Sequence, residues 1–253
     1  MRWYLKIIPL FFILVVWEIA ALLINNPFIL PHPAIVVSVL LAPTVDILGS
    51  GSLIDNTFLS IWRVALGFSL AVACAVPAGI IIGKYRTVDE LLDPVVQLFR
   101  PIPPLAWVPL ALAWFKIGLA SIIFIIFIGS FFPILINTID GVRRVNRTWL
   151  ETAEIYGAKG WKQLVYVIIP AAAPVIWTGL RVGFGVAWMC VVAAEMLPGT
   201  SSGIGYLIMY SYNWGQVPVI IAGMIIIGLI GIGVDMFFKG VERKKFQWME
   251  LSR

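Results

Sequence analysis

The sequence predicts an all-α integral membrane protein with about six transmembrane helices, and three observations lead to this class. The 253 residues are 61% hydrophobic and only 12% charged, about half the charged share of a soluble domain, and the mean hydropathy is +0.99. Long apolar runs without alternation favour helices over a closed barrel. Basic residues lie in short clusters between these runs, without the aromatic-rich patch of a nucleic-acid surface, which argues against nucleic acid as a partner.

Each predicted span is an apolar run that can cross a hydrocarbon core of about 30 Å as a helix. The six spans are residues 7–24, 57–82, 95–115, 119–139, 172–195 and 217–238. The third begins with RPIPPLAWVP, whose prolines are incompatible with a regular helix before Pro104, so a kinked or re-entrant entry is expected. The first has a basic start but no small-residue cleavage site, which favours a retained anchor over a signal peptide.

The distribution of basic residues predicts the topology. All Lys and Arg residues except Arg63, Arg181 and Lys116 fall on one predicted side, and the loops 25–56 and 196–216 contain none. Cytoplasmic loops collect basic residues, so both termini are predicted to be cytoplasmic and these two loops external. The first external loop is long enough to hold a short helix at the membrane surface.

A polar stretch, ETAEIYGAKGWKQLVYVIIP at 151–170, interrupts the apolar sequence between the fourth and fifth spans. Residues 150–156 can form a short helix, and Gly157 permits an elbow. A second helical segment follows, with Trp161, Leu164, Val165 and Ile168 on one face, and Pro170 suits the first turn of the next span. From the pattern alone, this helix pair fits either a groove in a partner protein or the lipid headgroups.

The spacing within this stretch resembles the EAA signature of ABC importer permeases. Glu151, Ala153, Gly157 and Pro170 match the signature, whereas Thr152, Val167 and Ile169 replace its first Ala, its Ile and its Leu. Four further segments are similar to permeases of the nitrate, sulfonate, taurine and bicarbonate importers: LDPVVQLFRPIPPLAWVPLALAWFKIG, FFPILINTIDGVRR, AAEMLPGTSSGIGYLI and VERKKFQW. The resemblance therefore covers most of the chain.

The resemblance implies a type I ABC importer permease fold, with residues 1–253 as one transmembrane domain and a cytoplasmic coupling loop at about 143–170. It implies import of a small solute across the cell membrane, with an oxyanion as the first candidate and a vitamin or its precursor as the alternative. Implied partners are two ABC ATPase subunits that hold ATP and Mg, a second permease copy and an extracytoplasmic solute-binding protein. No cofactor or enzymatic activity is expected in this chain. The residues implied to couple to the ATPase are Glu151, Ala153, Glu154, Gly157, Ala158 and Pro170.

Four ionisable residues fall within or near the predicted spans: Arg63, Arg181, Glu195 and Asp235. Charges in hydrocarbon are costly unless they are paired or functional. Depth along the spans places Arg63 with Glu195 and places Arg181 near Asp140 and Asp235, which favours two structural ion pairs. The alternative is that Arg63 or Arg181 faces the pathway and attracts an anion.

Other classes of function lack their expected marks. GIIIGK at 79–84 has three residues between its glycines where a phosphate-binding loop has four, so Gly79 with Gly83, like Gly179 with Gly183, is predicted to permit helix contact. A secondary transporter or channel would show mid-span polar clusters or matching broken helices in two halves. A membrane enzyme or metal site would need a convergent set of catalytic groups or ligands, and His32 is the only histidine.

Overall fold

The computed structural model describes residues 4–246, which form two compact units. The first unit comprises the residues up to Ser60 together with Glu195–Ile230, and the second comprises Ile61–Ala194 and the residues from Gly231 onward. Because three long helices contribute residues to both units, this division follows packing and not separate chain segments. The prediction of one transmembrane domain over 1–253 stays a prediction. The termini, predicted to be cytoplasmic, lie outside the described residues.

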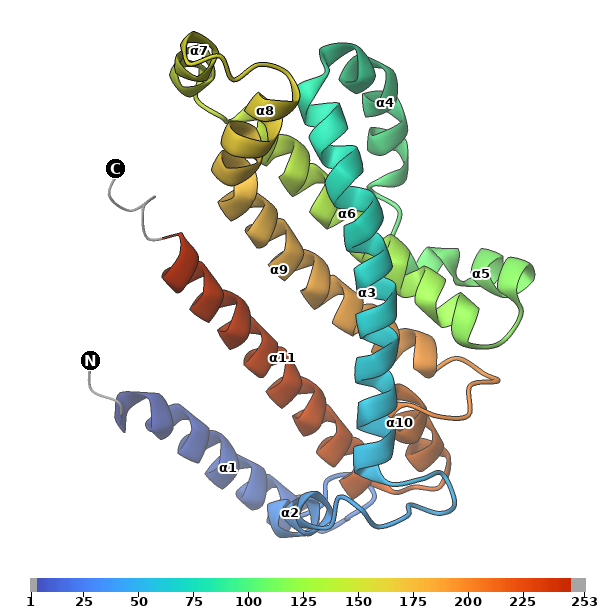
Figure 1. Cartoon of the computed structure of the whole chain (residues 1–253). Helices are drawn as coiled ribbons and strands as arrows, with labels where there is room; N and C mark the ends of the chain where they lie inside the picture. The colour runs from blue at the N-terminus through green and yellow to red at the C-terminus, as the bar shows by residue number, and fades with distance from the viewer. Residues whose placement is uncertain (1–3, 247–253) are drawn as a thin grey trace. The chain divides into compact units, whose positions relative to one another are not determined.

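The described chain is helical throughout its regular structure (Figure 1). The elements are α1 (Tyr4–Ile24), α2 (Pro33–Leu41), α3 (Leu53–Lys84), α4 (Arg86–Phe99), the 3₁₀ turn η1 (Pro104–Trp107), α5 (Val108–Phe115), α6 (Leu119–Arg143), α7 (Arg147–Ile155), α8 (Trp161–Gln163), the π-helical turn η2 (Leu164–Ile168), α9 (Ile169–Glu195), α10 (Ile204–Asn213) and α11 (Val217–Lys245).

These helices confirm the predicted membrane class. Four helices are long and apolar enough to span a bilayer, namely α3, α6, α11 and the continuous stretch Trp161–Glu195. A fifth span is counted if α4 and the helix from Pro104 to Phe115 form one broken span, which bends by 86°. The break falls where the prolines of the third predicted span forbid a regular helix. The first predicted span corresponds to α1, with a shorter apolar stretch at Phe11–Ile24.

The first unit packs its helices around a small apolar core. That core contains Val36, Leu53, Leu207, Val219 and Ala222. Here α2 is the short helix expected in the loop 25–56, and it begins at Pro33, where a missing amide hydrogen is harmless. The indole nitrogen of Trp17 in α1 donates a hydrogen bond of 3.0 Å to the carbonyl of Pro31, so the segment before α2 is tied to α1.

In the second unit α3 and α6 run parallel and in close contact through glycines of α3. A Cβ added at Gly79 would lie 2.6 Å from Thr138 Cβ, and one added at Gly83 would lie 2.8 Å from Val142 Cβ. The two partners are four residues apart on α6, as the glycines are on α3. The predicted role of this glycine pair in helix contact is confirmed.

The helix α9 packs against α6 in the opposite direction, again through two glycines. A Cβ added at Gly179 would lie 2.5 Å from Asn137 Cβ, and one added at Gly183 would lie 2.6 Å from Ile134 Cγ1. Of the four long helices, α6 is buried to the greatest extent. Small residues therefore let two neighbours approach α6 closely, and α6 forms the centre of this unit.

A candidate coupling loop and the membrane charges

The loop after α6 begins with a capped helix. Asn146 has extended backbone angles, and its side-chain oxygen accepts a hydrogen bond of 2.9 Å from the amide of Thr148. This is the usual way to satisfy one of the unpaired amides at a helix start. The sequence therefore starts α7 directly after α6, with Val145 buried between the two helices.

The signature residues of the loop build the C-terminal cap of α7. Gly157 has a φ of +79°, its amide donates to the carbonyl of Glu154 at 3.0 Å, and the amide of Ala158 donates to the carbonyl of Ala153 at 2.8 Å. This pair of bonds is a Schellman motif, which requires a left-handed residue where glycine costs least. The predicted elbow at Gly157 is confirmed. Glu151 lies exposed in the middle of α7.

The return limb of the loop is held against the first limb. The side-chain amide of Gln163 donates to the carbonyl of Leu150 at 3.2 Å and to the Glu154 carboxylate at 3.4 Å. Leu150 also packs on the cluster that contains Leu164 and Ile168. The predicted apolar face is thus buried at these two residues. Pro170 is the second residue of α9, but α9 continues the helix from η2 without a break.

One residue of that face, Trp161, is instead 74% exposed. The return limb passes through one π-helical turn at Leu164–Ile168, where regular α-helical spacing would not apply. Trp161 lies before this turn, as the first residue of α8. Periodicity alone does not indicate the turn.

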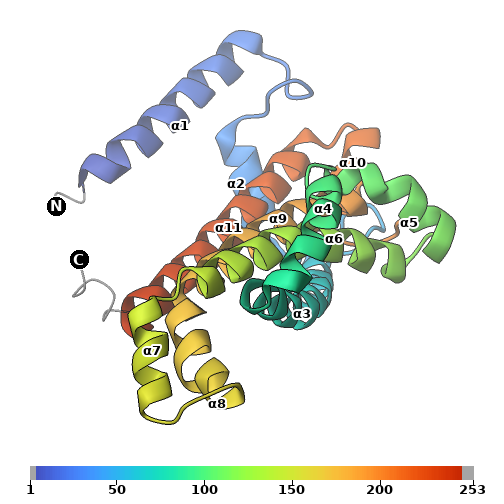
Figure 2. The same ribbon diagram turned by 90° about the horizontal axis from the view of Figure 1, so that it is seen from above.

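The tip of the loop is apolar and exposed, although its base is anchored. Ile155 is 84% exposed and Tyr156 is 85% exposed. At the base, Lys84 at the end of α3 donates a hydrogen bond of 3.4 Å to the carbonyl of Gly160. Figures 1 and 2 show α7 and α8 side by side beyond the end of α6. Such a rigid tip, with the predicted coupling residues at its elbow, can enter a groove of another protein.

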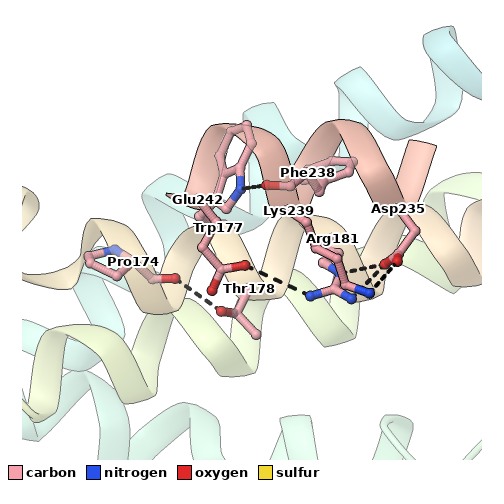
Figure 3. A network of polar contacts seen from close by, with 8 residues as sticks. All are labelled: Pro174, Trp177, Thr178, Arg181, Asp235, Phe238, Lys239 and Glu242. Atoms are coloured by element: carbon pink, nitrogen blue, oxygen red, sulfur yellow. Dashed lines mark hydrogen bonds and ion pairs between the residues drawn. The ribbon is translucent and has the colours of Figure 1, made fainter. Parts of the chain in front are cut away.

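Arg181 pairs with Asp235, one of the two carboxylates that the sequence places near it. Two nitrogens of Arg181 on α9 lie 2.7 and 2.6 Å from Asp235 Oδ1 on α11. Glu242 lies 3.8 Å from Arg181, and Lys239 lies 2.8 Å from Asp235 (Figure 3). The Trp177 indole on α9 donates a hydrogen bond of 3.0 Å to the carbonyl of Phe238, which lies between Asp235 and Glu242 on α11. Arg181 is therefore shared by two carboxylates, which links α9 to α11 and leaves little of its charge for an anion.

Glu195 is fully buried in the first unit, where it caps α10. Its Oε2 accepts hydrogen bonds from the hydroxyl of Ser60 at 2.7 Å and from the amide of Gly205 at 3.1 Å. The Ser60 hydroxyl accepts the amide of Ile204 at 2.8 Å, and Asn56 accepts that of Gly203 at 2.7 Å. Three successive amides at the start of α10 are thus satisfied, and a carboxylate there is favoured by the helix dipole.

The partner that the sequence suggests for Glu195 is Arg63, which lies in the second unit. The pairing of these two residues stays a prediction. No sequence pattern indicates the cap, because it joins residues about 140 positions apart in the chain.

One polar cavity is not apparent from the predicted spans. It lies beside α4, whose residues Asp89, Asp93, Gln97 and the following Arg100 all line it. These positions recur every three to four residues, so they share one helix face. The topology rule assigns Arg100 to the cytoplasmic basic residues and does not indicate this shared face. The spacing of the four residues is nevertheless present in the sequence.

Comparison with known proteins identifies the family. Residues 75–247 match the family described as binding-protein-dependent transport system inner membrane component. The chain belongs to this family. It is 58% identical over 239 residues to a protein of Methanocaldococcus jannaschii named as an ABC transporter permease, with 94% of this chain and 90% of that protein covered.

Two relatives carry more specific names. The chain is 34% identical to the Escherichia coli taurine transport system permease protein TauC, covering 92% of this chain and 84% of that protein. It is 40% identical to the bicarbonate transport system permease protein CmpB of Synechococcus elongatus strain PCC 7942, covering 74% and 68%.

Among solved structures, the inward-facing MetNI methionine ABC transporter contains a chain of similar fold. The TM-score is 0.66 at 13% identity, with 76% of this chain and 95% of that chain covered. This likeness supports the fold alone. Together with the family and the helices, the relatives identify the protein as a multi-pass membrane permease of an ABC importer.

Proposed function

We propose that this permease imports a small oxyanion, working as two identical copies with two ATPase subunits and an external solute-binding protein. The observation that carries this proposal is the capped loop after α6, whose exposed tip at Ile155 and Tyr156 is held by a Schellman cap and by Gln163. An apolar tip of this kind on a membrane protein needs a protein groove to cover it. A separate ATPase provides that groove and binds ATP and Mg²⁺.

The substrate class is inferred from the relatives. Taurine and bicarbonate, in the names of TauC and CmpB, share a compact anionic group with several oxygens. Guanidinium groups and oriented amides suit such a group. The same small-oxyanion class is the proposal for this chain, with the choice among members made by the binding protein.

The coupling role is assigned to the loop residues Glu151, Ala153, Glu154, Gly157, Ala158 and Pro170. The Schellman cap fixes the angle between α7 and the return limb, and the return limb continues without interruption into α9. Movement of a groove that holds the tip is therefore transmitted to a membrane helix and not absorbed by a slack loop.

Uptake into liposomes tests this proposal. The chain is expressed with its ATPase and binding protein, reconstituted, and supplied with labelled taurine, bicarbonate or thiamine. We expect uptake of an oxyanion that requires hydrolysable ATP and the binding protein. Uptake driven by an ion gradient without ATP would contradict the importer mechanism, and ATP-driven uptake of thiamine alone would overturn the oxyanion assignment.

A further inference from the structure

The second unit contains a polar cavity of about 220 Å³ between α4, α6 and the end of α3. Its lining includes three carboxylates, two arginines and one amide on two facing helices, and Asp93, Gln97 and Arg100 are exposed along it. Such a group of charges is unusual beside membrane-spanning helices. The charged and amide residues are Asp89, Asp93, Gln97, Arg100, Asp140 and Arg143.

The two ends of this cavity differ in depth. At one end, Asp89 on α4 forms an ion pair with Arg143, the last residue of α6. At the other end, Arg100 follows the last residue of α4, and Ile136 lines the cavity from α6. Ile136 lies about 10 Å along α6 from Arg143. Basic residues mark the cytoplasmic end of α6. Arg100 therefore lies at the end of the cavity that is farther from the cytoplasm.

The chain breaks directly after Arg100, and the break lies at the level of the middle of α6. Pro104 approaches Gly129, where a Cβ would lie 3.5 Å from Pro104 Cβ. Gly129 is about 21 Å along α6 from Arg143. Irregular backbone at this depth is tolerated only where protein buries it or where it lines a water-filled cavity. Broken helices at mid-membrane depth are also typical of transported-solute sites.

The other charges of the cavity have partners. Asp89 pairs with Arg143, Asp140 lies 4.0 Å from Arg144, and Gln97 donates to Asp93 at 3.5 Å. Within residues 4–246 no ion pair or hydrogen bond involves the guanidinium of Arg100.

A second donor lies close to the break. The rings of Phe99 and Trp107 are 5.8 Å apart across it. The buried Trp107 indole nitrogen is without a hydrogen-bond partner in the described part of the chain. A buried donor without an acceptor is unfavourable, so an acceptor that reaches it would relieve that cost. Among the described residues, the donors at the break thus lack acceptors, whereas Asp89 and Asp140 have arginine partners and Asp93 has only the neutral amide of Gln97.

We propose that this cavity is the cytoplasmic half of the translocation pathway. Arg100 contacts the transported oxyanion at the end of the cavity that is farther from the cytoplasm. This inference rests on the proposed function and names the residue that recognises its substrate class. The anion contact is thus assigned to Arg100 and not to Arg181, whose charge is shared with Asp235 and Glu242. The carboxylates nearer the cytoplasm keep binding weak, so that the anion leaves toward the cytoplasm, as conduction requires.

Thiol reactivity measures the potential that Arg100 creates, without knowledge of the substrate. The full chain, co-expressed with its ATPase in membrane vesicles, carries Cys74→Ser and Cys190→Ser plus Gln97→Cys as the reporter. The rates of its reaction with anionic and cationic methanethiosulfonate reagents are compared. A unit charge acts over about 10 Å at an effective dielectric near 20 strongly enough to change such rates severalfold.

We expect Arg100→Gln to lower the ratio of anionic to cationic rates at least fivefold and Arg100→Lys to keep it within twofold. Arg144→Gln, which removes an exposed charge that pairs with Asp140 of the same cavity, serves as the matched control and keeps the ratio within twofold. At Leu98→Cys, on the apolar face of α4, both reagents should react at least tenfold more slowly than at Gln97→Cys.

Two results would overturn the inference. An unchanged ratio in Arg100→Gln would show that Arg100 only stabilises the end of α4. Equal rates at Leu98→Cys and Gln97→Cys would show that the cavity is not a water-filled path. Failure of the proposed function is distinguishable, because it would appear as absent oxyanion uptake by the wild-type complex, whatever the reagent ratio.

Discussion

The elbow at Gly157 allows the coupling mechanism to be tested by backbone conformation alone. Its φ is +79°, and no atom lies within 4 Å of an added Cβ. Replacement by Ala, Asn or Val therefore introduces no clash with the rest of the protein. The remaining penalty is that of placing an L-residue in the left-handed region.

That penalty is about 1–2 kcal/mol for an ordinary residue, smaller for Asn and largest for a β-branched side chain. Since about 1.4 kcal/mol corresponds to a factor of ten, the capped elbow should be destabilised by about 5- to 30-fold in Gly157→Ala and by more in Gly157→Val. Gly157→Ala should be intermediate, and Gly157→Asn should stay closest to the wild type.

Hydrogen exchange in the purified complex measures the cap directly, through the amide of Ala158 that donates to Ala153. We expect its protection to fall in the order Asn, Ala, Val, and the solute imported per ATP hydrolysed to fall in the same order. Gly185→Ala is the matched control, because Gly185 also has open space around its Cβ but lies inside α9. There the replacement should be neutral or stabilising by up to about 1 kcal/mol. Equal protection in all three Gly157 variants would show that the left-handed residue does not hold the cap.

Three further predictions concern the membrane helices. Gly79→Leu should lower stability by about 1–3 kcal/mol, because its Cβ would overlap Thr138, whereas Gly228→Leu with open space should be neutral; thermal unfolding in detergent distinguishes them. A double-mutant cycle of Arg181→Gln and Asp235→Asn should give a coupling of about 0.5–1 kcal/mol, since both are partly exposed; zero coupling would contradict the observed pair. Glu195→Ala should cost about 1–3 kcal/mol by leaving a buried amide of α10 unsatisfied, and Glu195→Gln should cost less; equal losses would argue against the cap.

The helices are largely predictable from the sequence, because in hydrocarbon every backbone group must be satisfied within its own segment. Apolar runs therefore mark spans directly, and the prolines near Pro104 mark the span that breaks. The elbow is equally accessible, since a glycine between two short helical patterns is typical of a turn that needs a left-handed residue.

The remaining features depend on contacts that no local pattern encodes. The cap of α10 by Glu195, Ser60 and Asn56 joins distant segments, and the apolar spacing does not indicate that Trp161 is exposed. Arg100 illustrates the same limit. Its charge indicates a cytoplasmic residue by the topology rule, and only the packing shows that it lines the same cavity as Ile136, about 10 Å along α6 from Arg143.

The docking of the loop tip on the ATPase is tested most directly by photo-cross-linking. A benzophenone amino acid is placed at Tyr156, which is 85% exposed at the tip, or at Tyr212, which is 67% exposed on α10, in the complete importer. We predict that the ATPase is cross-linked from position 156 and not from position 212. No cross-link from 156, with the ATPase present in the complex, would contradict the account of this loop as the connection to ATP hydrolysis.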